Sequence, residues 1–309
     1  MNAFIPRFAR VKVFLLPSFR AGLSEIKPVL SSAAELRKKD QQMQKKSFGA
    51  LALASVVFVP TLAFAQFADS VVSYTSGTGF QPGYNTPASA LGEPSRVTPG
   101  MFGGPVDPFN SPYLSSQVVS LGVGGSLTVQ FNSPILNNLA NPFGLDFNIF
   151  GNAGFVITNG DYSGGGITDG TLYGADATST RISVSADGIN FFTLNPASAP
   201  LVDTQFPTDG SGNFGLPVNP ALDAGSFAGQ DLLGIRSLYN GSGGGRGFDI
   251  SWAQDGIGNS VTLPSISFVR VDVLGGNAEI DGFAVVPEPA GASLLLLGSL
   301  AFWAVRRRQ

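Results

Sequence analysis

Apolar and polar residues alternate in short runs through the middle of the chain. Leu145, Phe147 and Ile149 would share one face of a strand, as would Ile182 and Val184 within the run 181–185. An alternation with a period of two predicts β-strands that bury one face. The other runs that we interpret as strands are 118–123, 126–131, 191–194, the segment that holds Phe248, Ile250 and Trp252, and the runs 266–274 and 280–286.

The segments between these runs are rich in glycine. Gly124-Gly125 predicts a two-residue hairpin, and Asp187-Gly188 predicts a second turn. We interpret 161–176 and 240–245 as surface loops, because they hold too many glycines for a strand. Residues 66–285 show no apolar period of helical length. They therefore predict one all-β domain of about eight strands, arranged as a jelly-roll β-sandwich.

An apolar run before this domain has the features of a secretory signal peptide over residues 43–65. Met43-Gln44-Lys45-Lys46 is basic, residues 48–59 are apolar, and Ala63 and Ala65 form a small-x-small cleavage site. Residues 1–42 precede it and hold eight Lys or Arg against three acids. We interpret them as the result of a start codon assigned too early, with Met43 as the first residue. A long leader is the alternative.

A second apolar run, 290–305, is uncharged and ends in Arg306, Arg307 and Arg308. It predicts a hydrophobic helix that enters the membrane, although the run is somewhat shorter than the usual ~20 residues. The arginines would stay on the cytoplasmic side, which places the preceding domain outside. A buried C-terminal helix is the alternative.

The segment 286–309, with Pro287-Glu288-Pro289 before the apolar run, resembles the PEP-CTERM sorting signal of Gram-negative bacteria that make extracellular polysaccharide. The resemblance implies export by the secretion machinery and a transient anchor in the inner membrane. It further implies recognition by an exosortase, which cuts near the motif. The protein would then reach the cell surface or the extracellular matrix.

The composition of residues 66–285 excludes several classes of function. This part holds five arginines, no lysine, fifteen aspartates and two glutamates, a formal charge of −12, so we expect no nucleic-acid partner. The chain has no cysteine and no histidine, which removes His-based nucleophile systems and His-ligated zinc. We predict a protein that is not an enzyme and requires no cofactor.

Two segments of the domain resemble discoidin-like, galactose-binding-type β-sandwiches: 182–188 followed by Phe191-Phe192, and 266–271 followed by 278–283 as paired closing strands. A third segment, 146–152, is similar to a segment of bacterial and archaeal cell-surface proteins. The resemblance implies a galactose-binding-like sandwich and leaves the ligand open, because this architecture hosts many functions.

Acidic and amide side chains near strand ends are the candidates for a structural calcium site. Calcium takes six to eight oxygen ligands, and the residues that we name for it are Asp146, Asn152, Asp249, Glu279 and Asp281. Glu279 and Asp281 would project from the same strand face. The alternative for these two is a solvated face, or hydrogen bonds to nearby turn amides.

We expect a polysaccharide- or matrix-binding module. Trp252 shares a face with Phe248 and Ile250 and is assigned to the core, so tyrosines remain as rings that could stack on a sugar: Tyr74, Tyr84, Tyr113, Tyr162, Tyr173 and Tyr239. One alternative is a carboxylate-dependent polysaccharide-processing enzyme, in which two carboxylates face one cleft. The other is a structural matrix component without a defined ligand.

Overall fold

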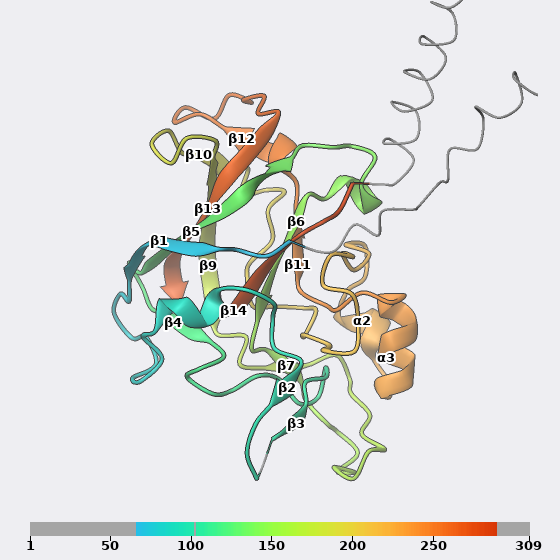
Figure 1. The fold of residues 1–309 in the computed structure, drawn as a ribbon. Coiled ribbons are helices and arrows are strands. Elements are labelled where there is room, and N and C mark those ends of the chain that lie inside the picture. The colour runs from blue at the N-terminus through green and yellow to red at the C-terminus, as the bar shows by residue number, and fades with distance from the viewer. Residues whose placement is uncertain (1–65, 102, 289–309) are drawn as a thin grey trace, which may run out of the picture. The chain divides into compact units, whose positions relative to one another are not determined.

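The computed structural model describes residues 66–101 and 103–288, which consist mostly of β-sheet with a few short helices (Figure 1). Residues 1–42, the predicted signal peptide with Ala63 and Ala65, and the run 289–309 with Pro289 and its three arginines lie outside these residues. No helix in 66–101 or 103–288 has the length and apolar character to span a membrane.

Two antiparallel sheets contain most of the strands. The larger has the order β1-β5-β13-β9-β10-β12 and the smaller the order β11-β6-β14-β4. The bounds of the first six are Ser70–Thr75, Ser126–Leu136, Ser265–Gly276, Ala177–Ser185, Phe192–Leu194 and Ala253–Gln254. Those of the other four are Arg246–Phe248, Phe147–Gly151, Ala278–Val285 and Val119–Leu121.

Short elements complete the described part. Two-stranded sheets pair β2 (Val97–Thr98) with β3 (Gly104–Pro105) and β7 (Gly154–Phe155) with β8 (Leu172–Tyr173). The α-helices are α2 (Ala224–Phe227) and α3 (Leu232–Tyr239). The 3-10 helices are η1 (Pro87–Ala90), η2 (Pro142–Gly144) and η3 (Ile250–Trp252).

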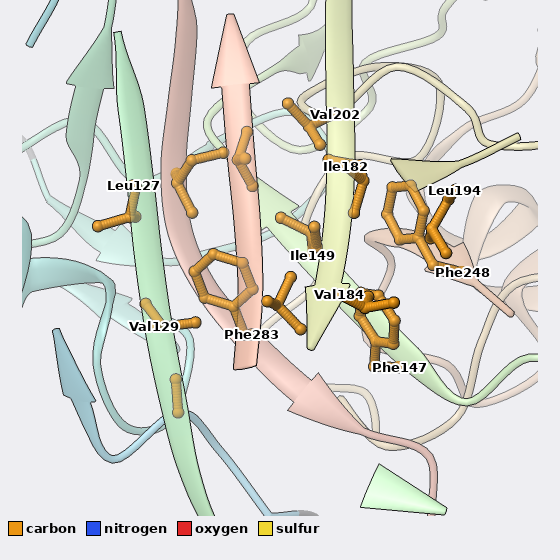
Figure 2. Close-up of a cluster of buried hydrophobic side chains, with 14 of the residues drawn as sticks. Leu127, Val129, Phe147, Ile149, Ile182, Val184, Leu194, Val202, Phe248 and Phe283 are labelled. Carbon is orange, nitrogen blue, oxygen red and sulfur yellow. The ribbon is translucent and has the colours of Figure 1, made fainter. Parts of the chain in front are cut away.

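The main core lies between the two large sheets. Val129 of β5 and Val184 of β9 come from one sheet, and Phe147 of β6 and Phe283 of β14 come from the other (Figure 2). Most of the side chains that the alternation assigned to the core, including Ile149 and Ile182, are buried there. Leu145 is buried outside this cluster, and Trp252 is half-buried against it. Burying one such side chain stabilises the fold by about 1.5–3 kcal/mol, so the alternation identified the residues that hold the sheets together.

The outer face of β6 is also buried, which the sequence did not predict. Asn148 and Phe150 of this face are fully buried, and Asn148 Nδ2 donates to Phe214 O at 3.0 Å. The rings of Phe150 and Phe214 meet edge to face, with centroids 5.0 Å apart. The irregular segment that contains Phe214 therefore covers this strand, and it continues into α2 and α3.

The predicted hairpin at Gly124-Gly125 is wrong. β4 pairs with β14 and β5 pairs with β1 and β13, so the chain crosses from one large sheet to the other at these glycines. The two closing strands β13 and β14 likewise lie in opposite sheets and do not pair with each other. By contrast, the turn at Asp187-Gly188 is confirmed, because it joins the paired strands β9 and β10.

Two further expectations fail around α3. The prediction of a domain without helices is wrong, because α3 runs for 8 residues. Asp231 is its N-cap, and Asn240 ends it in the left-handed conformation. The predicted surface loop at 240–245 is also wrong for its last four residues, since 242–245 are buried. A Cβ on Gly244 would lie 2.2 Å from Pro207 O, so glycine serves close packing here rather than exposure.

We expect Gly122→Ala to destabilise the fold and Gly256→Ala to leave it unchanged or slightly more stable. A Cβ at Gly122 would lie 2.2 Å from Thr78 O and 2.5 Å from Phe80 N, both backbone atoms. Such overpacking costs about 1–3 kcal/mol. Gly256 has open space around its Cβ position, and alanine there restricts the unfolded chain, worth about 0.4–1 kcal/mol. Urea unfolding measures both, and equal midpoints for the two variants would contradict the packing argument.

Candidate functional site

A groove of about 460 Å³ lies outside the main core, between β8, the loop before Phe206, the start of α2 and the start of β11. Its volume is in the range of about 300–1,000 Å³ that is common for ligand sites. It is lined by Gly170, Leu172, Leu201, Thr204, Gln205, Asp223, Ala224 and Arg246. Its wall thus combines two leucines with hydroxyl, amide, carboxylate and guanidinium groups.

Arg246 is the central charged residue of this groove. It opens β11 opposite Ile149 of β6, and its guanidinium carbon lies 4.9 Å from the centroid of the Phe206 ring. Nη1 donates a hydrogen bond to Gln205 Oε1, whereas Nε is enclosed and has no hydrogen-bond partner. Burial lowers the pKa of Arg246 to about 10, so the group is still positively charged near neutral pH.

Arg246 differs from the other arginines of the described residues, each of which pairs with a carboxylate. Arg96 pairs with Glu93 at 2.7 Å and Arg236 with Asp209 at 2.7 Å, while Arg181 and Arg270 share Asp272. Within 66–101 and 103–288, no carboxylate oxygen lies within 4.0 Å of the Arg246 guanidinium. A largely buried cation is therefore left without a counter-ion.

The loop that carries Gln205 is conformationally strained. Asp203 and Gln205 have φ angles of 54° and 62°, a left-handed backbone conformation that residues other than glycine rarely adopt. Gln205 Nε2 donates to Leu222 O, and Thr204 Oγ1 donates to Leu201 O at 2.9 Å. Strain of this kind costs about 1–3 kcal/mol per residue and concentrates at ligand-binding sites.

Asp223 is the carboxylate on the rim of the groove. Its Oδ1 accepts hydrogen bonds from Ser226 N at 2.9 Å and Ser226 Oγ at 2.8 Å, which caps the start of α2. The lining contains one cation and one capping carboxylate, so it suits hydrogen bonding and charge recognition. It does not bring together two free carboxylates for acid–base chemistry.

Two of the residues named for calcium, Asp146 and Asp249, lie near each other. Asp146 is fully buried and accepts from Asn138 N at 3.0 Å, Asn141 Nδ2 at 3.1 Å and Ile250 N at 2.9 Å. Burial raises the pKa of Asp146 to about 6, and the charge of Asp249 acts in the same direction. Asp249 caps η3 through a bond from Ser251 N at 2.7 Å.

The other three named residues occupy two further places. Asn152 Nδ2 donates to Glu279 Oε2, and Asp281 accepts from Ser95 N at 2.8 Å and Ser95 Oγ at 2.7 Å. Asp281 is buried, so the expectation of a solvated face does not describe it. No group of three or more acidic side chains in the described part of the chain is placed to hold a metal ion. Calcium binding stays a prediction.

Sequence reasoning missed Asp203, which organises the smaller sheet from a loop. Its Oδ1 accepts from Ala153 N at 2.8 Å and its Oδ2 accepts from Glu279 N at 3.1 Å. Burial raises the pKa of Asp203 to about 7. No spacing or motif marks this residue, because both of its partners are backbone amides far away in the sequence, one in the link between β6 and β7 and one in β14.

The aromatic candidates are also separated by the fold. Trp252 packs against the main core as predicted, but it lies in η3 with Ile250, so the predicted strand through Phe248, Ile250 and Trp252 is wrong. Tyr239 is buried, and its hydroxyl donates to Pro207 O at 2.9 Å. Tyr162 is 79% exposed, but it does not line the groove.

No family model matches this sequence, and no curated protein is significantly similar to it.

Proposed function

We propose that this chain is an exported, non-enzymatic protein of the cell surface or extracellular matrix that binds polysaccharide. The domain would be a jelly-roll sandwich of the galactose-binding type. The observation that carries the binding proposal is the groove beside Arg246, whose wall joins apolar side chains to hydrogen-bonding ones. Sugar rings offer both apolar faces and hydroxyl groups, so such a wall suits them.

The export part of the proposal rests on the two ends of the sequence. The signal peptide over 43–65 and the Pro287-Glu288-Pro289 segment with its apolar run support passage across the inner membrane and sorting by an exosortase. Pro287 and Glu288 follow β14, and Asn138 Nδ2 donates to Glu288 Oε2. The start of the sorting segment therefore contacts the β-domain, and an exosortase would have to displace Glu288 to bind it.

The test measures binding of the full chain, purified in detergent, to the extracellular polysaccharide of the bacterium that makes it. We expect saturable binding, no release of sugar, and a loss of about tenfold in affinity, worth about 1.4 kcal/mol, in Ala224→Trp. Ala224 is exposed and lines the groove, so tryptophan would fill it without entering the core. Ala197→Trp, at an exposed position away from the groove, is the matched control and should bind normally.

The other outcomes assign the protein to the alternatives. Sugar release would show a polysaccharide-processing enzyme, and Glu279→Gln and Asp281→Asn would then identify its carboxylates. Absence of binding would leave a structural matrix component. A melting temperature that falls on addition of chelator would support structural calcium, and an unchanged one would contradict it.

A further inference from the structure

We propose that the groove recognises the carboxylate of an acidic sugar, with Arg246 as the residue that binds it. This inference rests on the proposed polysaccharide-binding function and names its ligand class. The ligand would be a uronic acid within a polysaccharide, whose ring lies against the leucines and whose carboxylate meets the guanidinium.

The first argument is that Arg246 carries a positive charge without a counter-ion among the described residues. A guanidinium offers five N–H donors, yet Arg246 uses Nη1 on a neutral amide oxygen and leaves Nε without a partner. Asp203 lies in the same loop as Gln205, but its carboxylate accepts hydrogen bonds from Ala153 N and Glu279 N instead of pairing with Arg246. Burying an unpaired charge is unfavourable, and an anionic ligand would offset that cost.

The second argument is the geometry with which another arginine of this chain binds a carboxylate. Arg236 donates from Nε to Asp209 Oδ2 at 2.7 Å and from Nη2 to Asp209 Oδ1 at 3.0 Å, a two-point contact with one carboxylate. This fork geometry suits carboxylates and is stronger than a neutral hydrogen bond. At Arg246 the Nε donor is enclosed and out of reach of a ligand, but Nη2 donates to no described residue, so a ligand carboxylate in the groove would bind at Nη2.

The third argument sets the charge of the ligand. One guanidinium can neutralise one carboxylate, and the body around it carries a formal charge of −12. A doubly charged phosphate or a densely charged polyanion would meet net repulsion. Asp223 on the rim adds to that repulsion. A polysaccharide in which occasional uronic acids stand among neutral sugars fits these limits.

The experiment compares native polysaccharide from the producing bacterium with the same polymer after reduction of its carboxyl groups to alcohols. The full chain, Arg246→Gln and Asp223→Asn are titrated with both polymers. Asparagine caps helices as well as aspartate, so Asp223→Asn removes the rim charge and keeps α2. Cellobiouronate and cellobiose, which differ only in one carboxyl group, then compete for the site and show whether a short sugar suffices.

We expect the native polymer to bind at least about tenfold more tightly than the reduced one, a difference of about 1.4 kcal/mol. Arg246→Gln should abolish this preference, and Asp223→Asn should strengthen native binding by about two- to fivefold through lost repulsion. If Arg246→Gln does not fold, the Asp223→Asn result decides alone. Equal binding of both polymers, with no effect of either variant, would overturn the inference and leave the polysaccharide-binding function intact. No binding of either polymer would overturn both.

Discussion

Replacing Arg236 with alanine is expected to lower the free energy of unfolding by about 3–5 kcal/mol, the usual cost of leaving one partner of a buried ion pair unpaired. Asp209 is only 1% exposed, and both of its oxygens accept from Arg236. Burial alone would raise the pKa of Asp209, but the hydrogen bonds from Arg236 and Ser211 outweigh it and hold the pKa below its usual value. Removing Arg236 takes away the main contact that stabilises this carboxylate and leaves it buried without a counter-ion, a loss that urea unfolding at pH 7 would register.

The matched control is Arg181→Ala. Asp272 accepts from both Arg181 and Arg270, at 3.2 and 2.8 Å, so it keeps one cation when Arg181 is lost. Arg181 is also 44% exposed, and exposed pairs contribute about 0–1 kcal/mol. The double variant Arg236→Ala with Asp209→Asn should recover part of the stability, because it removes the buried charge. If Arg236→Ala and Arg181→Ala lowered the free energy of unfolding by the same amount within error, the result would contradict this account of the Arg236–Asp209 pair.

The strands of the core were predictable because their side chains alternate. Ile182 and Val184 of β9, and Phe147 and Ile149 of β6, point into the main core as the pattern indicates. The partners of each strand were not predictable. Gly124-Gly125 has the length and composition of a hairpin, but it lies where the chain changes sheets, and pairing between distant strands leaves no local mark in the sequence.

The short helix α3 was missed because its eight residues are too few to show a helical period. Its ends are nevertheless marked in the sequence, by Asp231 as N-cap and Asn240 followed by Gly241 at the other end. The glycines that follow were misread because glycine permits both exposed flexibility and close packing. Gly243, whose Cβ would lie 2.4 Å from the Phe214 ring, belongs to the second kind.

The candidate site was beyond the reach of sequence reasoning for a different reason. Arg246 follows a run of three glycines and looks like a solvated residue in a flexible loop. Its importance comes from burial, from the Phe206 ring beside it and from the absence of a carboxylate among the described residues, and each depends on segments about forty residues away. The acids that were named instead are held by backbone amides and amide side chains of other loops, as Asp281 is held by Ser95 N.

Stability is expected to increase as the pH falls from 8 to 5. Burial raises the pKa of Asp203 and of Asp281 to about 7, and that of Asp146 to about 6. In the unfolded chain these carboxyls titrate near 3.9. At a pH between the unfolded and the folded pKa, the folded state holds protons that the unfolded state has released. Lowering the pH therefore favours the folded state. This contribution is fully present below about pH 4 and is lost as the pH rises through 7.

The expected gain from pH 8 to pH 5 is on the order of 5–7 kcal/mol, because each pKa unit corresponds to about 1.4 kcal/mol. Asp203 and Asp281 each contribute over about two pH units of this range, and Asp146 contributes over about one. Asp209 acts in the opposite direction, since its pKa is lowered, and its contribution is lost only as the pH falls below the unfolded value. Stability should thus be greatest at mildly acidic pH and decline again toward pH 3.

Urea unfolding across pH 3–8 measures this profile, and Asp281→Asn separates one titrating group from the rest. Asparagine can keep both contacts with Ser95, because its oxygen accepts from Ser95 N while its amide donates to Ser95 Oγ, a hydroxyl that can also accept. The variant removes a carboxyl that takes up a proton on folding, so the stability change between pH 5 and 8 should fall by about two-fifths. A wild-type profile that is flat or rises toward pH 8 would mean that Asp203 and Asp281 stay ionised in the fold. Their backbone and hydroxyl donors would then outweigh the cost of burying two charges.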